Sequence, residues 1–156
     1  LNFLAPMLVT GAASKHMAEQ GIAGSIINIA SSRGERAYPG DAVYGGLKAA
    51  LRRATESLAL ELAPYGIRVN AIAPGAIQTV PGREASYAEL GKKIPLERVG
   101  TPEDIGEAAV WLSSPQASYI TGITLRIDGG LILPGMPEGG PGAGEYGWGR
   151  PDWTKK

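Results

Sequence analysis

The chain has 156 residues, of which 44% are hydrophobic and 19% are charged, and 15 basic side chains balance 15 acidic ones. These proportions are typical of one globular domain, and the lack of net charge gives no indication of a nucleic acid or an anionic membrane as a partner. With no cysteine and a single histidine, the sequence excludes disulfides, thiol catalysis and a metal site built from cysteine or histidine clusters.

The first predicted elements are a helix, a strand and a second helix. Apolar residues recur at helical spacing over residues 1–20. Residues 25–30 form a short apolar run rich in branched side chains, which is typical of a strand buried on both faces of a parallel sheet. The second helix is expected over residues 42–63, and its basic pair Arg52-Arg53 is interpreted as a solvated helix face rather than a binding patch.

Two further strands, a lid and a third long helix follow. The second strand is expected over residues 67–72. Residues 80–99 combine charges with helix breakers and contain one short helix near residues 87–92, so we interpret them as a lid. Thr101 caps a helix that runs to about residue 113. The last strand is expected over residues 123–127.

This order of elements is that of half an open α/β sheet, in which we expect the three strands to be adjacent and parallel. The predicted domain covers residues 1–130. Residues 131–156 differ, because they hold seven glycines and four prolines together with Trp148 and Trp153. Since a plain linker would be poorer in aromatic residues, we interpret them as an irregular C-terminal extension that packs on another surface, with a disordered tail as the alternative.

Tyr44 and Lys48 lie four positions apart on the second predicted helix, and Ser31 precedes the tyrosine by thirteen positions. Positions i and i+4 share a helix face, so the ammonium lies beside the phenol. A positive neighbour favours the phenolate, which allows the tyrosine to exchange a proton with a substrate oxygen that a serine can hold. The chemistry indicated is the interconversion of a carbonyl and an alcohol, although a Tyr-x-x-x-Lys pair alone is more often ordinary helix surface.

Six segments in series form a recognisable pattern. They are Leu1-Asn2 with Leu8-Val9-Thr10, residues 27–32 (INIASS), Tyr44 with Lys48, residues 68–79 (RVNAIAPGAIQT), residues 100–105 (GTPEDI), and residues 119–122 (YITG) with 128–130 (DGG). In this order they resemble the C-terminal part of the classical short-chain dehydrogenase/reductase family, over residues 1 to about 133. The resemblance implies the C-terminal half of a Rossmann-like, doubly wound parallel sheet. It also implies an NAD(P)-dependent oxidoreductase that acts on a small carbonyl or alcohol substrate.

The resemblance implies a role for each catalytic position. Tyr44 would be the general acid in reduction and the base in oxidation. Lys48 would favour the phenolate and bond the nicotinamide ribose. Ser31, rather than Ser32, would orient the substrate oxygen, and Asn2 would hold a water that relays protons to Lys48. Leu47 departs from the family pattern, which usually has a small residue or serine before the lysine, and this change should leave Tyr44 and Lys48 aligned.

The resemblance also implies a nicotinamide site. Pro74, Gly75, Ile77 and Thr79 would position the nicotinamide of NAD or NADP, with Thr79 bonding its carboxamide. The glycine-rich turn that holds the pyrophosphate in this fold has no counterpart in the chain, nor has the residue that separates NAD from NADP. The sequence therefore does not predict that this chain binds the whole dinucleotide by itself.

Three interpretations stay open at this point. The first is an NAD(P)-dependent oxidoreductase represented by a truncated chain. The second is a cofactor-independent ester hydrolase, in which Ser31 is activated by Tyr44 and Lys48. The third is an inactive fragment that oligomerises.

The expected partner is a second copy of the chain. The strand over residues 25–30 leaves an exposed edge, and the apolar stripes of the two long helices are broad enough to serve both the sheet and a partner. No apolar run reaches the roughly 18 residues that span a bilayer, and no signal peptide is recognised, so we expect a cytoplasmic protein with no membrane partner and no metal.

Overall fold

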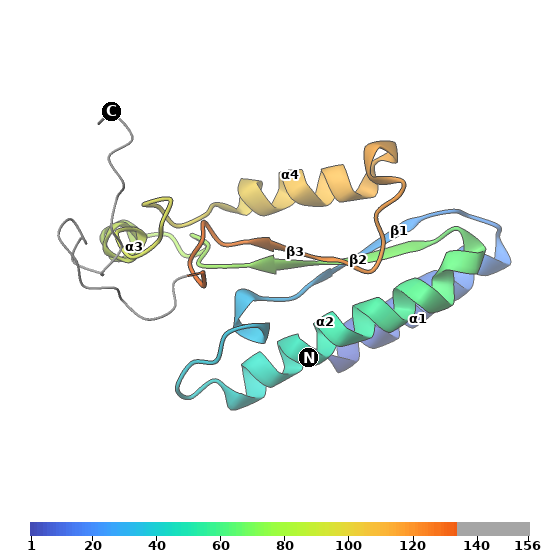
Figure 1. Cartoon of the computed structure of the whole chain (residues 1–156), viewed down its shortest axis with the longest axis horizontal. Coiled ribbons are helices and arrows are strands. Elements are labelled where there is room, and N and C mark those ends of the chain that lie inside the picture. Colours follow the sequence, from blue (N-terminus) through green and yellow to red (C-terminus); the bar gives the residue numbers. More distant parts are fainter. Residues whose placement is uncertain (134–156) are drawn as a thin grey trace, which may run out of the picture.

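The fold is built on a parallel sheet. The computed structural model describes residues 1–133, in which β1 (Ser25–Ile29), β2 (Arg68–Pro74) and β3 (Thr124–Ile127) lie in the order β1-β2-β3 (Figure 1). Both pairs are parallel, with Ile29 opposite Ile72 and Ala73 opposite Arg126. The expected adjacent, parallel strands are therefore confirmed, and β2 continues to Pro74, beyond the predicted end at residue 72.

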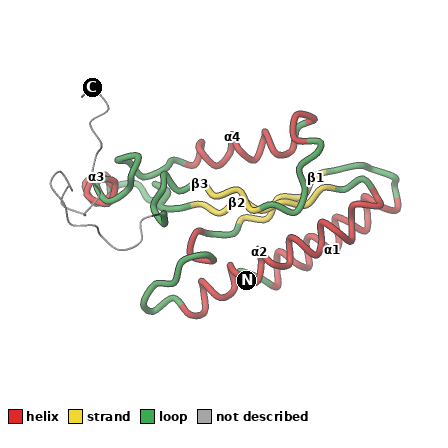
Figure 2. Tube along the Cα trace, viewed as in Figure 1, coloured by secondary structure: helices red, strands yellow, loops and turns green. Residues whose placement is uncertain are grey.

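Helices cover both faces of this sheet. α1 (Leu4–Glu19) and α2 (Ala42–Leu62) lie on one face, and α4 (Pro102–Ser113) lies on the other (Figure 1). The short α3 (Glu84–Gly91) lies beyond the carboxyl ends of β2 and β3 (Figure 2). Helix α1 begins three residues later than predicted, and α3 begins before the predicted start at residue 87, within the segment interpreted as a lid.

The predicted start of α4 is confirmed by its cap. Thr101 Oγ1 accepts a hydrogen bond from the Asp104 amide at 3.4 Å, and the Asp104 carboxylate accepts one from the Thr101 amide at 2.7 Å. Arg98 donates to both carboxylate oxygens, at 2.6 and 2.8 Å. The Arg98 guanidinium and the Thr101 amide hold the pKa of Asp104 well below its ordinary value. The end of the lid segment is thus tied to the first turn of α4.

The core surrounds β2. This central strand is a nearly continuous apolar run because it is covered on both faces. Its fully buried apolar residues are Val69, Ala71, Ile72 and Ala73. Asn70 is also fully buried, and its side chain is satisfied because it donates to the Ile120 carbonyl at 3.0 Å and accepts from the Ile123 amide at 3.1 Å.

The apolar stripe of α1 faces away from the sheet. Leu4, Leu8 and Val9 are 65–68% exposed, whereas Thr10 and Ser14 are the buried residues of this helix. The expectation that this stripe serves the sheet as well as a partner is therefore wrong for α1. The helix contacts the core through its other side, where Met17 packs against the cluster of α2 and β2 residues.

Two expectations fall partly outside the described residues. The proposed C-terminal extension, with Trp148 and Trp153, lies beyond residue 133 in all but its first three residues, and the domain boundary at residue 130 stays a prediction. Within residues 1–133, no helix has both the length and the apolar character needed to cross a membrane.

Candidate active site

Two predicted site residues, Ser31 and Pro74, lie at the carboxyl ends of strands, and the turn that begins at Asp128, predicted only as a structural turn, lies at the same edge of the sheet. Ser31 comes two residues after β1, Pro74 is the last residue of β2, and Asp128 follows β3 directly. Because all three strands are parallel, their carboxyl ends share this edge, which is where open α/β sheets bind ligands.

Ser31 is held by a short turn. It caps the 3-10 turn Ser32–Gly34, and its hydroxyl oxygen accepts a hydrogen bond from the Arg33 amide at 3.2 Å. The side chain is buried, in an extended backbone conformation. A serine hydroxyl that accepts in this way keeps its own O–H to donate, so Ser31 can still bond a substrate oxygen.

The side chain of Lys48 extends from α2 to the end of β1, the strand that precedes Ser31. Its ammonium donates to the Ile29 carbonyl at 2.7 Å, and its side chain is buried. Burial lowers the pKa of Lys48, because the charged form loses contact with water. The ammonium lies 5.7 Å from the centroid of the Tyr44 ring, and Tyr44 is 38% exposed. The structure thus brings the buried Lys48 ammonium close to the partly exposed Tyr44 ring and to the end of β1, two residues before Ser31.

Two glycines allow the Ser31 turn to lie directly on α2. A Cβ at Gly34 would lie 2.9 Å from the amide nitrogen of Ala49 and from the carbonyl carbon of Lys48. A Cβ at Gly45 would lie 2.9 Å from the Arg33 carbonyl oxygen. Real Cβ atoms essentially never approach other atoms within 3.0 Å, so both positions need glycine. Sequence reasoning missed these contacts, and the local signal on α2 was the pair Gly45-Gly46 between Tyr44 and Lys48.

The residues predicted to hold the nicotinamide lie along the segment after β2. Gly75 donates its amide to the Ile127 carbonyl at 2.9 Å, and a Cβ on Gly75 would lie only 2.6 Å from Asp128 Cβ. Ile77 forms a bridge with Gly100 and lines a pocket of about 250 Å³ that Asp128 also lines. Thr79 lines a second, more open pocket of about 410 Å³.

Asn2 stays a predicted member of this group. It is exposed and precedes α1, rather than lying on the helix as the sequence pattern predicted. The predicted connection between Asn2 and Lys48 is through a water, and the Lys48 ammonium itself bonds the Ile29 carbonyl. The described residues also bring together no three histidine, aspartate or glutamate side chains that could hold a metal ion.

Known proteins that resemble this chain match it over most of its length. Residues 1–132 match the family described as enoyl-(acyl carrier protein) reductase. Glucose 1-dehydrogenase 2 of Bacillus subtilis is 42% identical over 137 residues, which are 85% of this chain and 53% of that protein. The chain therefore spans about half the length of the curated relatives it matches.

Solved structures show the same partial match. Acetoin dehydrogenase from Salmonella typhimurium is 40% identical, with a TM-score of 0.76 over 86% of this chain and 54% of that one. A 4-hydroxyisoleucine dehydrogenase complexed with NADH is 37% identical, with a TM-score of 0.78 over 86% of this chain and 57% of that one. At these identities the likeness extends beyond the fold, and none of these names describes an ester hydrolase.

Proposed function

The chain belongs to the short-chain dehydrogenase/reductase family, and on that basis we propose that the protein carrying it is an NAD(P)-dependent oxidoreductase that interconverts a carbonyl and an alcohol. The observation that carries the proposal is the contact of Lys48 with the end of β1, one helical turn from Tyr44 and two residues before Ser31. The proposed substrate is a small carbonyl or alcohol compound.

The segment after β2 fits a flat, partly polar group such as nicotinamide. Gly75 leaves no side chain between the ends of β2 and β3, and Pro74, Ile77 and Thr79 follow the same edge. We propose that these four residues hold the nicotinamide, with the Thr79 hydroxyl on its carboxamide. NAD and NADP fit this part of the site equally. When bound, the nicotinamide supplies or accepts the hydride.

The chain's own residues would handle the proton. In reduction, the Tyr44 hydroxyl donates its proton to the substrate oxygen while the Ser31 hydroxyl donates a hydrogen bond to the same oxygen. In oxidation, the Tyr44 phenolate takes the proton back. Lys48 has three N–H donors, of which the Ile29 carbonyl takes one, so two stay available for the phenol and the ribose. The water relay through Asn2 stays a prediction.

Tyr44→Phe tests this assignment, because it keeps the ring and removes only the hydroxyl. Turnover of NAD(P)H with a panel of small carbonyl compounds should fall by about 10²-fold or more, with an unchanged unfolding temperature. Tyr65→Phe is the matched control, since Tyr65 is exposed beyond the end of α2. Retained turnover in Tyr44→Phe would rule out the tyrosine as the acid/base. Cofactor-free ester cleavage that is lost in Ser31→Ala would support the hydrolase instead.

We further propose that the protein is a homo-oligomer. The outward stripe of α1, formed by Leu4, Leu8 and Val9, puts three large apolar side chains of one helix in water, which folded monomers rarely do over a contiguous area. Light scattering should give a mass above that of one chain, and Leu8→Glu should lower it. A monomeric mass for the unaltered protein would refute this proposal. The cytoplasmic location stays a prediction.

A further inference from the structure

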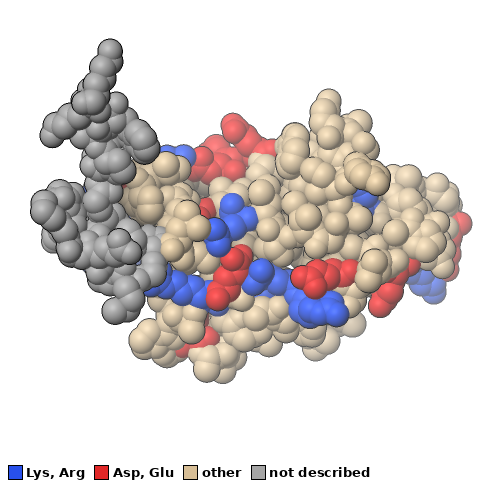
Figure 3. All heavy atoms as spheres, viewed as in Figure 1, with Lys and Arg blue, Asp and Glu red and all other residues tan. Residues whose placement is uncertain are grey.

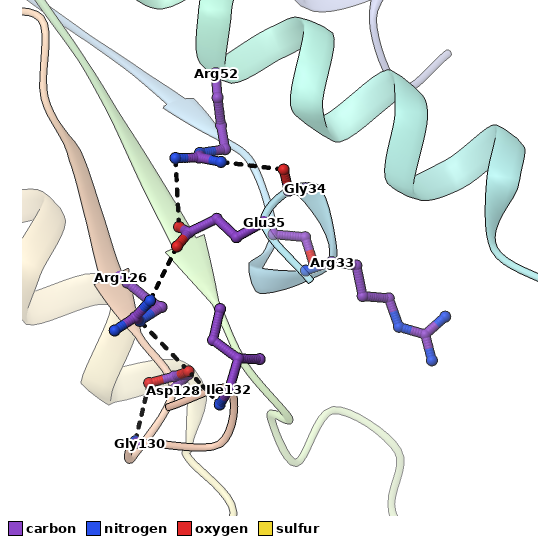
Figure 4. Close-up of polar contacts among 9 residues, drawn as sticks. Arg33, Gly34, Glu35, Arg52, Arg126, Asp128, Gly130 and Ile132 are labelled. Atoms are coloured by element: carbon purple, nitrogen blue, oxygen red, sulfur yellow. Dashed lines mark hydrogen bonds and ion pairs between the residues drawn. The ribbon is translucent and has the colours of Figure 1, made fainter. Parts of the chain in front are cut away.

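Charged side chains alternate in a band across one face of the molecule (Figure 3). A network of ion pairs and hydrogen bonds connects the turn after β1 with α2 and β3 (Figure 4). Its centre is Glu35, whose two carboxylate oxygens lie 3.6 Å from Arg52 Nη2 and 2.9 Å from Arg126 Nη1. Arg126 Nε lies 3.6 Å from Asp128 Oδ2. Two guanidinium groups and two carboxylates therefore form a neutral chain of contacts.

Arg52 attaches the Ser31 turn to α2. Besides its contact with Glu35, its guanidinium donates to the Gly34 carbonyl at 3.0 Å. Its side chain is 30% exposed, in contrast to Arg53, whose side chain is 70% exposed. The interpretation of Arg52-Arg53 as one solvated face is thus wrong for Arg52. Neighbouring helix positions point in different directions, and only Arg53 points into solvent.

At the other end, Asp128 fixes the turn after β3. Its carboxylate accepts hydrogen bonds from the Gly130 amide at 2.9 Å and the Ile132 amide at 3.1 Å. The carbonyl of Gly129 in this turn accepts from the Leu96 amide at 3.1 Å, which supports the lid segment. Asp128, Gly129 and Leu96 all line the pocket next to Ile77. The orientation of this turn therefore shapes one wall of the candidate site.

We propose that Glu35 is a positioning residue that keeps the Ser31 turn in register with the Asp128 turn. Glu35 lies in the turn after β1, and Arg126 lies in β3. Because β2 lies between β1 and β3 in the sheet, their ion pair connects two segments on opposite sides of β2. The Glu35 side chain is 21% exposed, so its pairs are only partly screened by water. A glutamine at this position would have one acceptor oxygen, which could bond only one of the two guanidinium groups. Its NH₂ group would face the other guanidinium group and could not accept a hydrogen bond from it. The effect of Glu35 on catalysis rests on the proposed function, because it acts through Ser31.

The kinetic experiment uses Glu35→Gln, Arg126→Gln and the double variant in the protein that carries this chain. Each single substitution should lower kcat about tenfold and leave KM for the substrate within about twofold, because misplacement of Ser31 affects the transition state more than binding. The kcat of the double variant should be no lower than that of the less active single variant, because each single substitution already breaks the Glu35–Arg126 ion pair. Glu56→Gln, which breaks an exposed pair with Arg53 on α2, is the control and should leave kcat unchanged.

A second measurement does not depend on turnover. Hydrogen exchange at the Gly130 and Ile132 amides should be about tenfold faster in Glu35→Gln and Arg126→Gln, and unchanged in Glu56→Gln. If the unaltered protein shows no NAD(P)-linked turnover, the proposed function fails while the exchange result still decides whether Glu35 positions the turn. Unchanged exchange in Glu35→Gln would overturn the positioning role. Turnover of Glu35→Gln equal to that of the unaltered protein would also overturn it, as would losses that add in the double variant.

Discussion

Replacing Gly45 and Gly46 with alanine, one at a time, tests how closely α2 packs on the turn after β1. A Cβ at Gly46 would meet no atom within 4 Å, whereas one at Gly45 would lie 2.9 Å from the Arg33 carbonyl oxygen and 3.0 Å from Asp41 Oδ2. Either substitution removes a glycine from a helix, which alone should stabilise the protein by about 0.5–1 kcal/mol. The Gly45 contact is 0.5 Å shorter than the 3.4 Å at which ordinary contact begins (3.4 − 2.9 Å). Because a backbone oxygen is involved, overpacking should cost about 1–3 kcal/mol.

The assay is equilibrium unfolding of both variants under identical conditions. Gly46→Ala should be as stable as the unaltered protein or slightly more stable. Gly45→Ala should be about 1–3 kcal/mol less stable than Gly46→Ala, because the gain in helix propensity cancels between the two. It should also lower turnover, since the strain displaces the turn that carries Ser31. Equal stability of the two variants would refute the close packing of α2 on this turn, and with it the support that the packing gives to Ser31.

Two further predictions concern pH. Bonding by Arg98 and the Thr101 amide lowers the pKa of Asp104 from 3.8, so its contribution to stability is present above that value and is lost as pH falls toward the depressed pKa. Asp104→Asn should flatten the acid limb of the stability profile, and an identical limb would contradict this. Burial lowers the pKa of Lys48 from 10.5, so the unfolded state binds the proton more tightly and stability should rise as pH increases toward 10.5. Lys48→Met should remove that rise, and a rise that persists would belong to another group.

The elements could be predicted from sequence where local patterns decide them. The strand β1 and the Thr101 cap of α4 are both found, but the expected burial of β1 on both faces is wrong, because Ile29 is 47% exposed. The sequence predicts too early an end for β2, because Pro74-Gly75 is typical of a break in a strand. A proline lacks only the N–H, however, and at the last position of a strand it can keep its place in the register, here opposite Ile127.

The site could be predicted only in part, for a physical reason. The spacing of Tyr44 and Lys48 on one helix is a local property, and the resemblance to a family identified Ser31. The burial of Lys48 and its bond to the Ile29 carbonyl depend on how α2 lies against β1, which no local pattern determines. Glu35 and Arg126 are 91 residues apart, so their ion pair is a product of the sheet order.

The burial of Lys48 supports the proposal that α2 carries part of the active site. Within residues 1–133 it is the one buried basic side chain, and its lowered pKa reflects the cost of taking an ammonium out of water. The bond to the Ile29 carbonyl offsets part of that cost. An apolar side chain on this inward face of α2 would carry no such cost. The proposed function gives a lysine at this position an electrostatic task, which is to hold a fixed cation beside the Tyr44 phenol while that phenol stays open to substrate.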